Sequence, residues 1–156
     1  MVAESLHKLR SALPPGVELV AVSKFHPVER LMEAYNAGQR LFGENRPQEL
    51  AAKAPQMPAD VQWHFIGHLQ TNKLKLVLPY VTMVQTVDSF HLLEAINNWC
   101  ADNSKTIDIL LELHLGAEET KTGFTEEEIL SIVSGAGTPS ETAFASLRPF
   151  PSRDAL

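Results

Sequence analysis

The sequence predicts an α/β protein built on a parallel β-sheet, and three observations lead to this prediction. Short runs rich in β-branched and aromatic residues recur about every twenty residues between residues 18 and 133. A helical segment with one apolar stripe separates each pair of runs, as in consecutive right-handed βαβ crossovers. The runs are largely apolar, as in strands covered on both faces. The pattern fits either a doubly wound sheet or part of a barrel.

The first strand is expected at residues 18–24, after a leading helix over residues 2–12 that lies outside the repeating pattern. Pro27 then stands where a first helical turn accepts proline, and Gly38 stands where a helix ends. The helix between them has an apolar stripe at helical spacing, made of Val28, Leu31, Met32 and Tyr35.

The second and third units follow the same order. Residues 40–44 form the second expected strand, and its helix covers residues 47–54, ended by the prolines at 55 and 58. Residues 61–66 form the third strand. Gly67 and a helix follow, with apolar positions at Leu69, Leu74 and Val77 before Pro79.

The fourth and fifth units have helix-capping signals. Residues 83–87 form the fourth strand, and Ser89 is the expected cap of a helix that bears Leu92, Leu93, Ile96 and Trp99. The fifth strand spans residues 106–115. After a loop, residues 125–128 read Thr-Glu-Glu-Glu, a capping box that opens a helix over Ile129, Ile132 and Val133.

Composition excludes several classes of partner. The 156 residues are 44% hydrophobic and 21% charged, which is typical of one globular domain. The formal net charge is −6 and no dense Lys/Arg run occurs, so neither nucleic acid nor an anionic membrane is expected as a partner. No export signal or membrane span is found, and the single Cys100 fits a reducing compartment; we expect a cytoplasmic protein with Cys100 buried in a helix.

Lys24 is the residue whose position alone suggests chemistry. It ends an apolar strand, and the carboxyl ends of parallel strands form the functional face of α/β folds. We expect partial burial there to favour the neutral amine, the nucleophile that condenses with an aldehyde. The structural alternative is a lysine that extends to water from a strand end.

Polar residues also follow the other strands, although each signal is weak by itself. His64 is as typical of a hydrogen-bonded core histidine as of a functional one, and His64 with His68 lacks a third ligand at metal-site spacing, so we expect no metal. Trp63 and Trp99 are expected in the core. No glycine-rich nucleotide loop follows the first strand, which disfavours a nucleotide-binding doubly wound fold. The other candidates are Gly43, Glu44, Asn45, Gly67, Thr86, Asp88 and residues 114–121.

Five motifs in order carry a resemblance to a known family. They are AVSK at residues 21–24, LFGEN at 41–45 with QE at 48–49, WHFIGHLQTNK at 63–73, VQTVDS at 84–89, and ETKTGF at 119–124. Together they strongly resemble the pyridoxal phosphate homeostasis proteins, single-domain relatives of the alanine racemase barrel. Five motifs in one order are far more specific than any one of them.

The resemblance implies a parallel (β/α)8 barrel of the TIM type and pyridoxal 5′-phosphate (PLP) as the cofactor. It implies that Lys24 forms an internal imine with PLP and that Asn45 and His64 lie on the cofactor's side of the barrel mouth. It also implies that Glu119, Lys121 and Gly123 shape the loop after the fifth strand. Proteins of this family buffer PLP and deliver it to PLP-dependent apoenzymes, so a carrier without robust catalysis is expected.

The chain departs from the family pattern in two ways. His114 stands where the family usually has Asn. A complete barrel takes roughly 250 residues, about 200 at the short end, so 156 residues are expected to form about five of the eight βα units, without the late loops that hold the PLP phosphate.

We therefore expect a partial barrel domain over residues 1–133 and a divergent, loosely ordered tail over residues 134–156, with one helical turn near 141–147. Such a chain would be truncated relative to the family. Open sheet edges would then favour self-association, and PLP would be held weakly.

Three alternatives to a PLP carrier remain at this point. One is a racemase-like or other PLP-dependent enzyme, although no substrate-binding second domain is recognised. Another is a cofactor-free aldolase in which Lys24 attacks a substrate carbonyl. The last is a non-functional fragment whose motifs survive without a working site.

Overall fold

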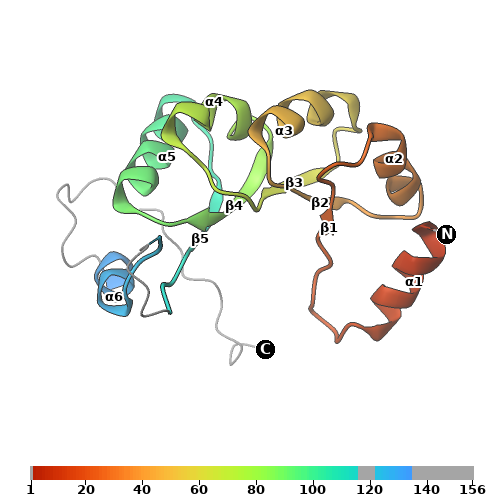
Figure 1. The fold of residues 1–156 in the computed structure, drawn as a ribbon, viewed down its shortest axis with the longest axis horizontal. Helices are drawn as coiled ribbons and strands as arrows, with labels where there is room; N and C mark the ends of the chain where they lie inside the picture. The colour runs from red at the N-terminus through yellow and green to blue at the C-terminus, as the bar shows by residue number, and fades with distance from the viewer. Residues whose placement is uncertain (1, 116–121, 135–156) are drawn as a thin grey trace. The chain divides into compact units, whose positions relative to one another are not determined.

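A computed structural model of the chain describes residues 2–115 and 122–134. Its sheet has five strands in the order β1-β2-β3-β4-β5, and the pairings of β1 through β4 are parallel (Figure 1). The predicted α/β class and the alternation of strands with helices are confirmed. The strands are β1 Ala21–Val22, β2 Leu41–Glu44, β3 Gln62–Phe65, β4 Val81–Val87 and β5 Asp108–Leu111.

The chain divides into two compact units. The first comprises Met1–Thr86 and Thr106–Leu110, and the second comprises Val87–Lys105 and the residues from Leu111 onward. In the first unit, α2, α3 and α4 lie on the same side of the strands (Figure 1). Its helices are α1 Val2–Ala12, α2 Val28–Asn36, α3 Pro47–Lys53 and α4 Leu74–Val77, with 3₁₀ turns η1 Ala54–Gln56 and η2 Thr71–Lys73.

Most helices match their predicted ranges, but the helix expected after the third strand does not. The leading helix at residues 2–12 is confirmed, whereas α4 begins only at Leu74. Leu69 is 2% exposed and lies before η2, outside any helix. The apolar spacing at 69, 74 and 77 therefore reflects burial from a loop as well as from a helix.

Alternation along the strands gives the sheet of the first unit two faces. Phe42 and Trp63 pair in register, and their ring centroids are 5.7 Å apart. Both are buried, as is Phe65 two residues further along β3. Burial of such large apolar side chains stabilises the fold by about 1.5–3 kcal/mol each. On the opposite face, where Gly43 pairs with His64, side chains are only half-buried, among them Val20, His64 and Ile66.

Glu44, one of the strand-end candidates, points to the buried face of β2 and not to an open site. It is fully buried and forms an ion pair with Lys53 of α3 at 2.8 Å. The hydroxyl of Ser23 donates a second hydrogen bond to the same carboxylate at 2.8 Å. A buried carboxylate without such partners would be strongly destabilising. Glu44 is therefore a structural residue.

The second unit contains both predicted helix caps. Ser89 Oγ accepts a hydrogen bond from the Leu92 amide at 3.2 Å at the start of α5, Phe90–Asp102. At the start of α6, Glu126–Ser134, the amide of Glu128 donates to Thr125 Oγ1, and the amide of Thr125 donates to the Glu128 carboxylate. This reciprocal pair is a capping box, as predicted.

Two strands, β1 and β5, are shorter than the sequence indicated by several residues. The ladder of β1 covers two residues instead of residues 18–24. Its carboxyl end comes early because the chain turns sharply after Ser23, where the His26 amide donates to the Ser23 carbonyl at 3.1 Å. Strand β5 ends at Leu111, and the next bridge joins Leu113 to Phe124. β-propensity in a sequence does not reveal where pairing partners stop.

Some expectations remain predictions. The tail at 135–156, including the helical turn near 141–147, lies outside the described residues, so the boundary between domain and tail remains untested.

Of the two predicted core tryptophans, Trp63 is buried and Trp99 is half-buried. No helix in the described part of the chain is long and apolar enough to cross a bilayer.

Gly67 is predicted to be intolerant of a side chain. A Cβ at this position would overlap the Asn45 carbonyl oxygen, and backbone cannot move aside cheaply. We expect Gly67→Ala to lower the free energy of unfolding by about 3 kcal/mol or more. In Gly43→Ala the new methyl would meet Val20 Cγ1 at 2.9 Å and Ile66 Cδ1 at 3.1 Å, both side-chain ends, so we expect a smaller loss of about 1 kcal/mol. Urea denaturation measures both, and equal losses would contradict the close backbone approach.

Candidate functional site

Lys24 lies in the turn that directly follows β1. The hydrogen bond from the His26 amide to the Ser23 carbonyl closes this turn, and Phe25 adopts a left-handed φ of 63° within it. The side chain of Lys24 is exposed, so the partial burial that we expected is wrong. The reason is that the ladder of β1 ends before Ser23, which places Lys24 in a surface turn instead of a strand. Its amine is freely accessible to a dissolved aldehyde.

Phe25 and Arg46 form an aromatic and cationic surface beside Lys24 that sequence reasoning missed. Phe25 is 65% exposed, and the guanidinium carbon of Arg46 lies 4.4 Å from its ring centroid. The Lys24 ammonium nitrogen lies 6.0 Å from the same centroid. Two cations therefore flank one ring, and the Arg46 guanidinium also forms an ion pair with the Glu49 carboxylate at 3.5 Å. The available signal was an arginine directly after the LFGEN motif.

Asn45 follows β2 directly, at the edge of the sheet where Lys24 follows β1. Its side-chain Oδ1 is buried, and no described residue hydrogen bonds to it. The backbone of Asn45 is held in place, because its amide donates to the Glu44 carboxylate at 3.0 Å and its carbonyl lies against Gly67. A buried amide oxygen without a protein partner is a position where a ligand's donor would be accommodated.

His64 is half-buried in β3, one residue before the strand ends. Its Nδ1 lies 2.9 Å from Nε2 of Gln85 in β4, and in the tautomer that carries its proton on Nε2 it accepts a hydrogen bond from this amide. Burial lowers the pKa of His64, against the opposing influence of the carboxylates of Glu18 and Asp108. His64 is thus a neutral, hydrogen-bonded imidazole.

The loop after β5 is only partly described. Glu119 and Lys121 lie outside the described residues. Gly123 has a φ of 104°, and a Cβ there would approach the Glu112 carbonyl to 2.9 Å, so this position requires glycine. His114 Nε2 in the same unit is buried with no described hydrogen-bond partner. Among the described residues, no group of three or more His, Cys, Asp or Glu side chains is placed to hold a metal ion.

The structure thus brings two of the predicted site residues to the carboxyl end of the sheet. Lys24 and Asn45 follow the neighbouring parallel strands β1 and β2, and His64 pairs in register with Gly43 on the adjacent strand. Thr86 is engaged with backbone, since its hydroxyl donates to the Gly67 carbonyl. The available chemistry is that of an accessible primary amine after β1, with a buried amide oxygen after the neighbouring strand and a half-buried imidazole on the strand beyond it.

Comparison with known proteins identifies relatives of the chain. The family model described as "Alanine racemase, N-terminal domain" matches residues 2–145. The pyridoxal phosphate homeostasis protein of Schizosaccharomyces pombe is 43% identical over 125 residues, which cover 79% of this chain and 53% of the relative. The chain thus spans about half the length of the curated relatives it matches.

Solved structures match the fold. PipY of Synechococcus elongatus with PLP bound has a TM-score of 0.79 and 35% identity, covering 90% of this chain and 66% of PipY. The structure of PipY without PLP has a TM-score of 0.80 and 36% identity, covering 86% of this chain and 64% of PipY. These matches agree with the family resemblance and with a partial barrel, as the sequence indicated.

His64 is expected to make stability depend on pH. Because burial lowers its pKa in the folded state, the fold favours the neutral ring; the stabilisation is present above the unfolded pKa of about 6.5 and is lost as pH falls through the folded pKa. We expect His64→Gln to reduce the fall in melting temperature between about pH 7.5 and 5. Thermal denaturation measures this. His7→Gln, at an exposed site in α1, serves as the control, and an equal effect of both variants would contradict the assignment.

Proposed function

The chain belongs to the alanine racemase N-terminal domain family, and from this premise we propose that it binds PLP as an imine on Lys24. The observation that carries the proposal is the position of Lys24, in a tight turn at the carboxyl end of β1. In parallel α/β folds this edge is where ligands bind. The similarity to a relative whose structure contains PLP supports PLP as the ligand.

The proposed attachment needs only the amine and the aldehyde. The Lys24 nitrogen attacks the aldehyde carbon, a C=N bond replaces the C=O bond, and the two hydrogens lost from nitrogen leave with the oxygen as one water molecule. The exposure of Lys24 supports the necessary access. When bound, PLP supplies an electron-withdrawing ring that can stabilise negative charge on an attached carbon.

The neighbouring residues fit such a ligand. The buried Asn45 Oδ1 has no described partner, and rotation of the amide would offer a donor instead, so Asn45 can satisfy a polar atom of the ring. The cationic group of Arg46 beside Phe25 favours a phosphate-bearing molecule over a neutral aldehyde. We propose that His64 faces the ring in its neutral form, while roles for Glu119, Lys121 and Gly123 remain predictions.

The proposed biological role is intracellular PLP homeostasis. On this proposal the protein works in the cytoplasm, holds PLP reversibly and passes it to PLP-dependent apoenzymes, without robust catalysis of its own. The names of relatives with 36–43% identity support this role. An imine on an accessible lysine suits it, because a competing amine can displace the cofactor.

A racemase-like enzyme is a second candidate, favoured by the description of the matching family model. Racemisation requires acid/base groups on both faces of the bound substrate. Among the described residues, His64 is the one imidazole that we propose near the ring. Its Nδ1 is within hydrogen-bond distance of Gln85. Loss of optical activity from single enantiomers of amino acids would identify this activity.

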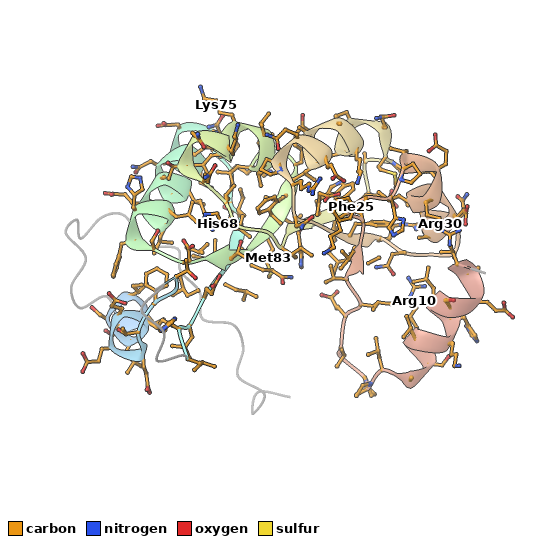
Figure 2. The ribbon with its side chains drawn as sticks, in the orientation of Figure 1. Arg10, Phe25, Arg30, His68, Lys75 and Met83 are labelled. Carbon is orange, nitrogen blue, oxygen red and sulfur yellow. The ribbon has the colours of Figure 1, made fainter. Side chains whose placement is uncertain are left out.

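The proposal predicts selective labelling of Lys24. PLP is added to the full chain, the imine band is recorded, borohydride reduces the adduct, and peptide mass spectrometry locates it. We expect Lys24→Ala to lower the total adduct by more than about tenfold. Lys75→Ala is the matched control, because Lys75 is exposed on α4 and points away from the sheet (Figure 2).

Other outcomes would each favour a different function. Similar labelling of Lys24, Lys73 and Lys75 would contradict a selective site and leave only a non-functional fragment. Borohydride trapping of a keto substrate on Lys24 without PLP would favour the cofactor-free aldolase.

We also propose that copies of the chain associate through the edge strands. Among the described residues, β1 and β5 are the outer strands of the sheet, and Val22 and Leu110 are 50% and 38% exposed. Unpaired backbone groups at such edges can pair with a second chain. We expect light scattering to show dimers or larger species, and Val22→Lys to reduce them. A monomer at every concentration would contradict this proposal.

A further inference from the structure

The residue before Lys24 is held by hydrogen bonds through all its polar groups. The Ser23 amide donates to the Gly43 carbonyl at 2.8 Å, and the Ser23 hydroxyl donates to Glu44 Oε2 at 2.8 Å. The Ser23 carbonyl accepts a hydrogen bond from the ammonium group of Lys53 at 2.9 Å. Ser23 is 1% exposed, so these bonds form away from water and fix the backbone that leads into Lys24.

The residue after Lys24 is held from the same helix. The Phe25 amide donates to Glu49 Oε2 at 3.1 Å. Phe25 has a left-handed φ of 63°, a conformation that is unfavourable for a residue with a side chain and that persists only where its surroundings enforce it. Glu49 is one of these surroundings.

Lys53 contacts both carboxylates that hold this turn, Glu44 and Glu49. Its ammonium nitrogen lies 2.8 Å from Glu44 Oε2 and 2.7 Å from Glu49 Oε2, and its side chain is 10% exposed. Burial lowers the pKa of Lys53, but its hydrogen bonds to the two carboxylates outweigh this and raise it. The hydrogen bond from Lys53 in turn lowers the pKa of Glu49. Lys53 and Glu49 are therefore charged at neutral pH, and their ion pair is held away from most of the solvent.

We infer that Lys53 and Glu49 are positioning residues for Lys24. In this inference neither Lys53 nor Glu49 contacts the ligand. Lys53 holds the peptide before Lys24 and Glu49 holds the peptide after it, so α3 fixes both ends of the backbone from which the reactive amine extends. This inference rests on the proposed function, because it concerns the efficiency with which Lys24 forms its imine.

The consequence is chemical as well as structural. The exposed side chain of Lys24 has many rotamers, and the backbone alone limits where its nitrogen can reach. A turn free to rotate about Phe25 would spread that nitrogen over a larger volume. Small losses of orientation of this kind reduce the rate of a reaction between held groups substantially.

The test compares two variants at Glu49 in the full chain. Glu49→Ala removes the acceptor for Phe25 and for Lys53, whereas the carbonyl oxygen of Glu49→Gln can still accept from both. The measured quantity is the ratio of borohydride-trapped PLP adduct on Lys24 to that on Lys75 in the same sample. We expect Glu49→Ala to lower this ratio by about tenfold or more, and Glu49→Gln to recover most of it.

Glu33→Ala provides a matched control, because Glu33 is an exposed helical carboxylate that is ion-paired to Arg30 at 2.9 Å in α2. We expect it to leave the ratio unchanged. Hydrogen exchange supplies a readout independent of PLP: the Phe25 amide should exchange about tenfold faster in Glu49→Ala than in the original chain.

Two outcomes would overturn the inference: an unchanged adduct ratio in Glu49→Ala, or a Phe25 amide whose exchange does not respond to that substitution. Failure of the original chain to label Lys24 would instead overturn the proposed function. In that case hydrogen exchange would still decide whether Glu49 anchors the turn.

Discussion

The ammonium group of Lys53, buried between the carboxylates of Glu44 and Glu49, is the interaction on which the first unit depends. One side chain from α3 thereby contacts the end of β2 and the chain leaving β1. Each charge would be costly to bury alone, and removal of one partner from such a group typically costs about 3–5 kcal/mol. The same contacts that satisfy these charges also shape the turn that presents Lys24.

This arrangement explains why structural and functional residues alternate along short stretches of the chain. In residues 43–45, Gly43 lies on the half-buried face, Glu44 on the buried face, and Asn45 beyond the strand end. In residues 23–25, a buried serine and an exposed phenylalanine flank the exposed lysine. Motifs that look continuous in sequence thus serve the core at one position and the candidate site at the next.

Much of this could be predicted from the sequence, where the responsible interactions are local. The caps at Ser89 and Thr125 involve residues three positions apart, and both are confirmed. The order of strands and helices follows from hydrophobic periodicity. Family motifs pointed to Lys24 and Asn45, which the structure places at the ends of neighbouring strands.

The errors concern contacts between residues distant in sequence. The ladder of β1 depends on β2, so its short length was invisible in residues 18–24. The exposure of Lys24 follows from that early end. Glu44 was grouped with site residues because its partner Lys53 comes nine positions later, and only the fold shows that they meet. The stacking of Arg46 on Phe25 likewise joins separate loops.

The left-handed backbone at Phe25 sets stability and surface chemistry in opposition at a single position. Glycine there would relax the turn, since it adopts such angles without steric cost. It would also delete the exposed ring on which the Arg46 guanidinium rests, leaving that cation its ion pair with Glu49 alone. A homologue with glycine at position 25 would gain thermal stability but lose the aromatic ring beside its reactive amine. Selection for heat tolerance and selection for ligand binding would therefore favour different residues at this position.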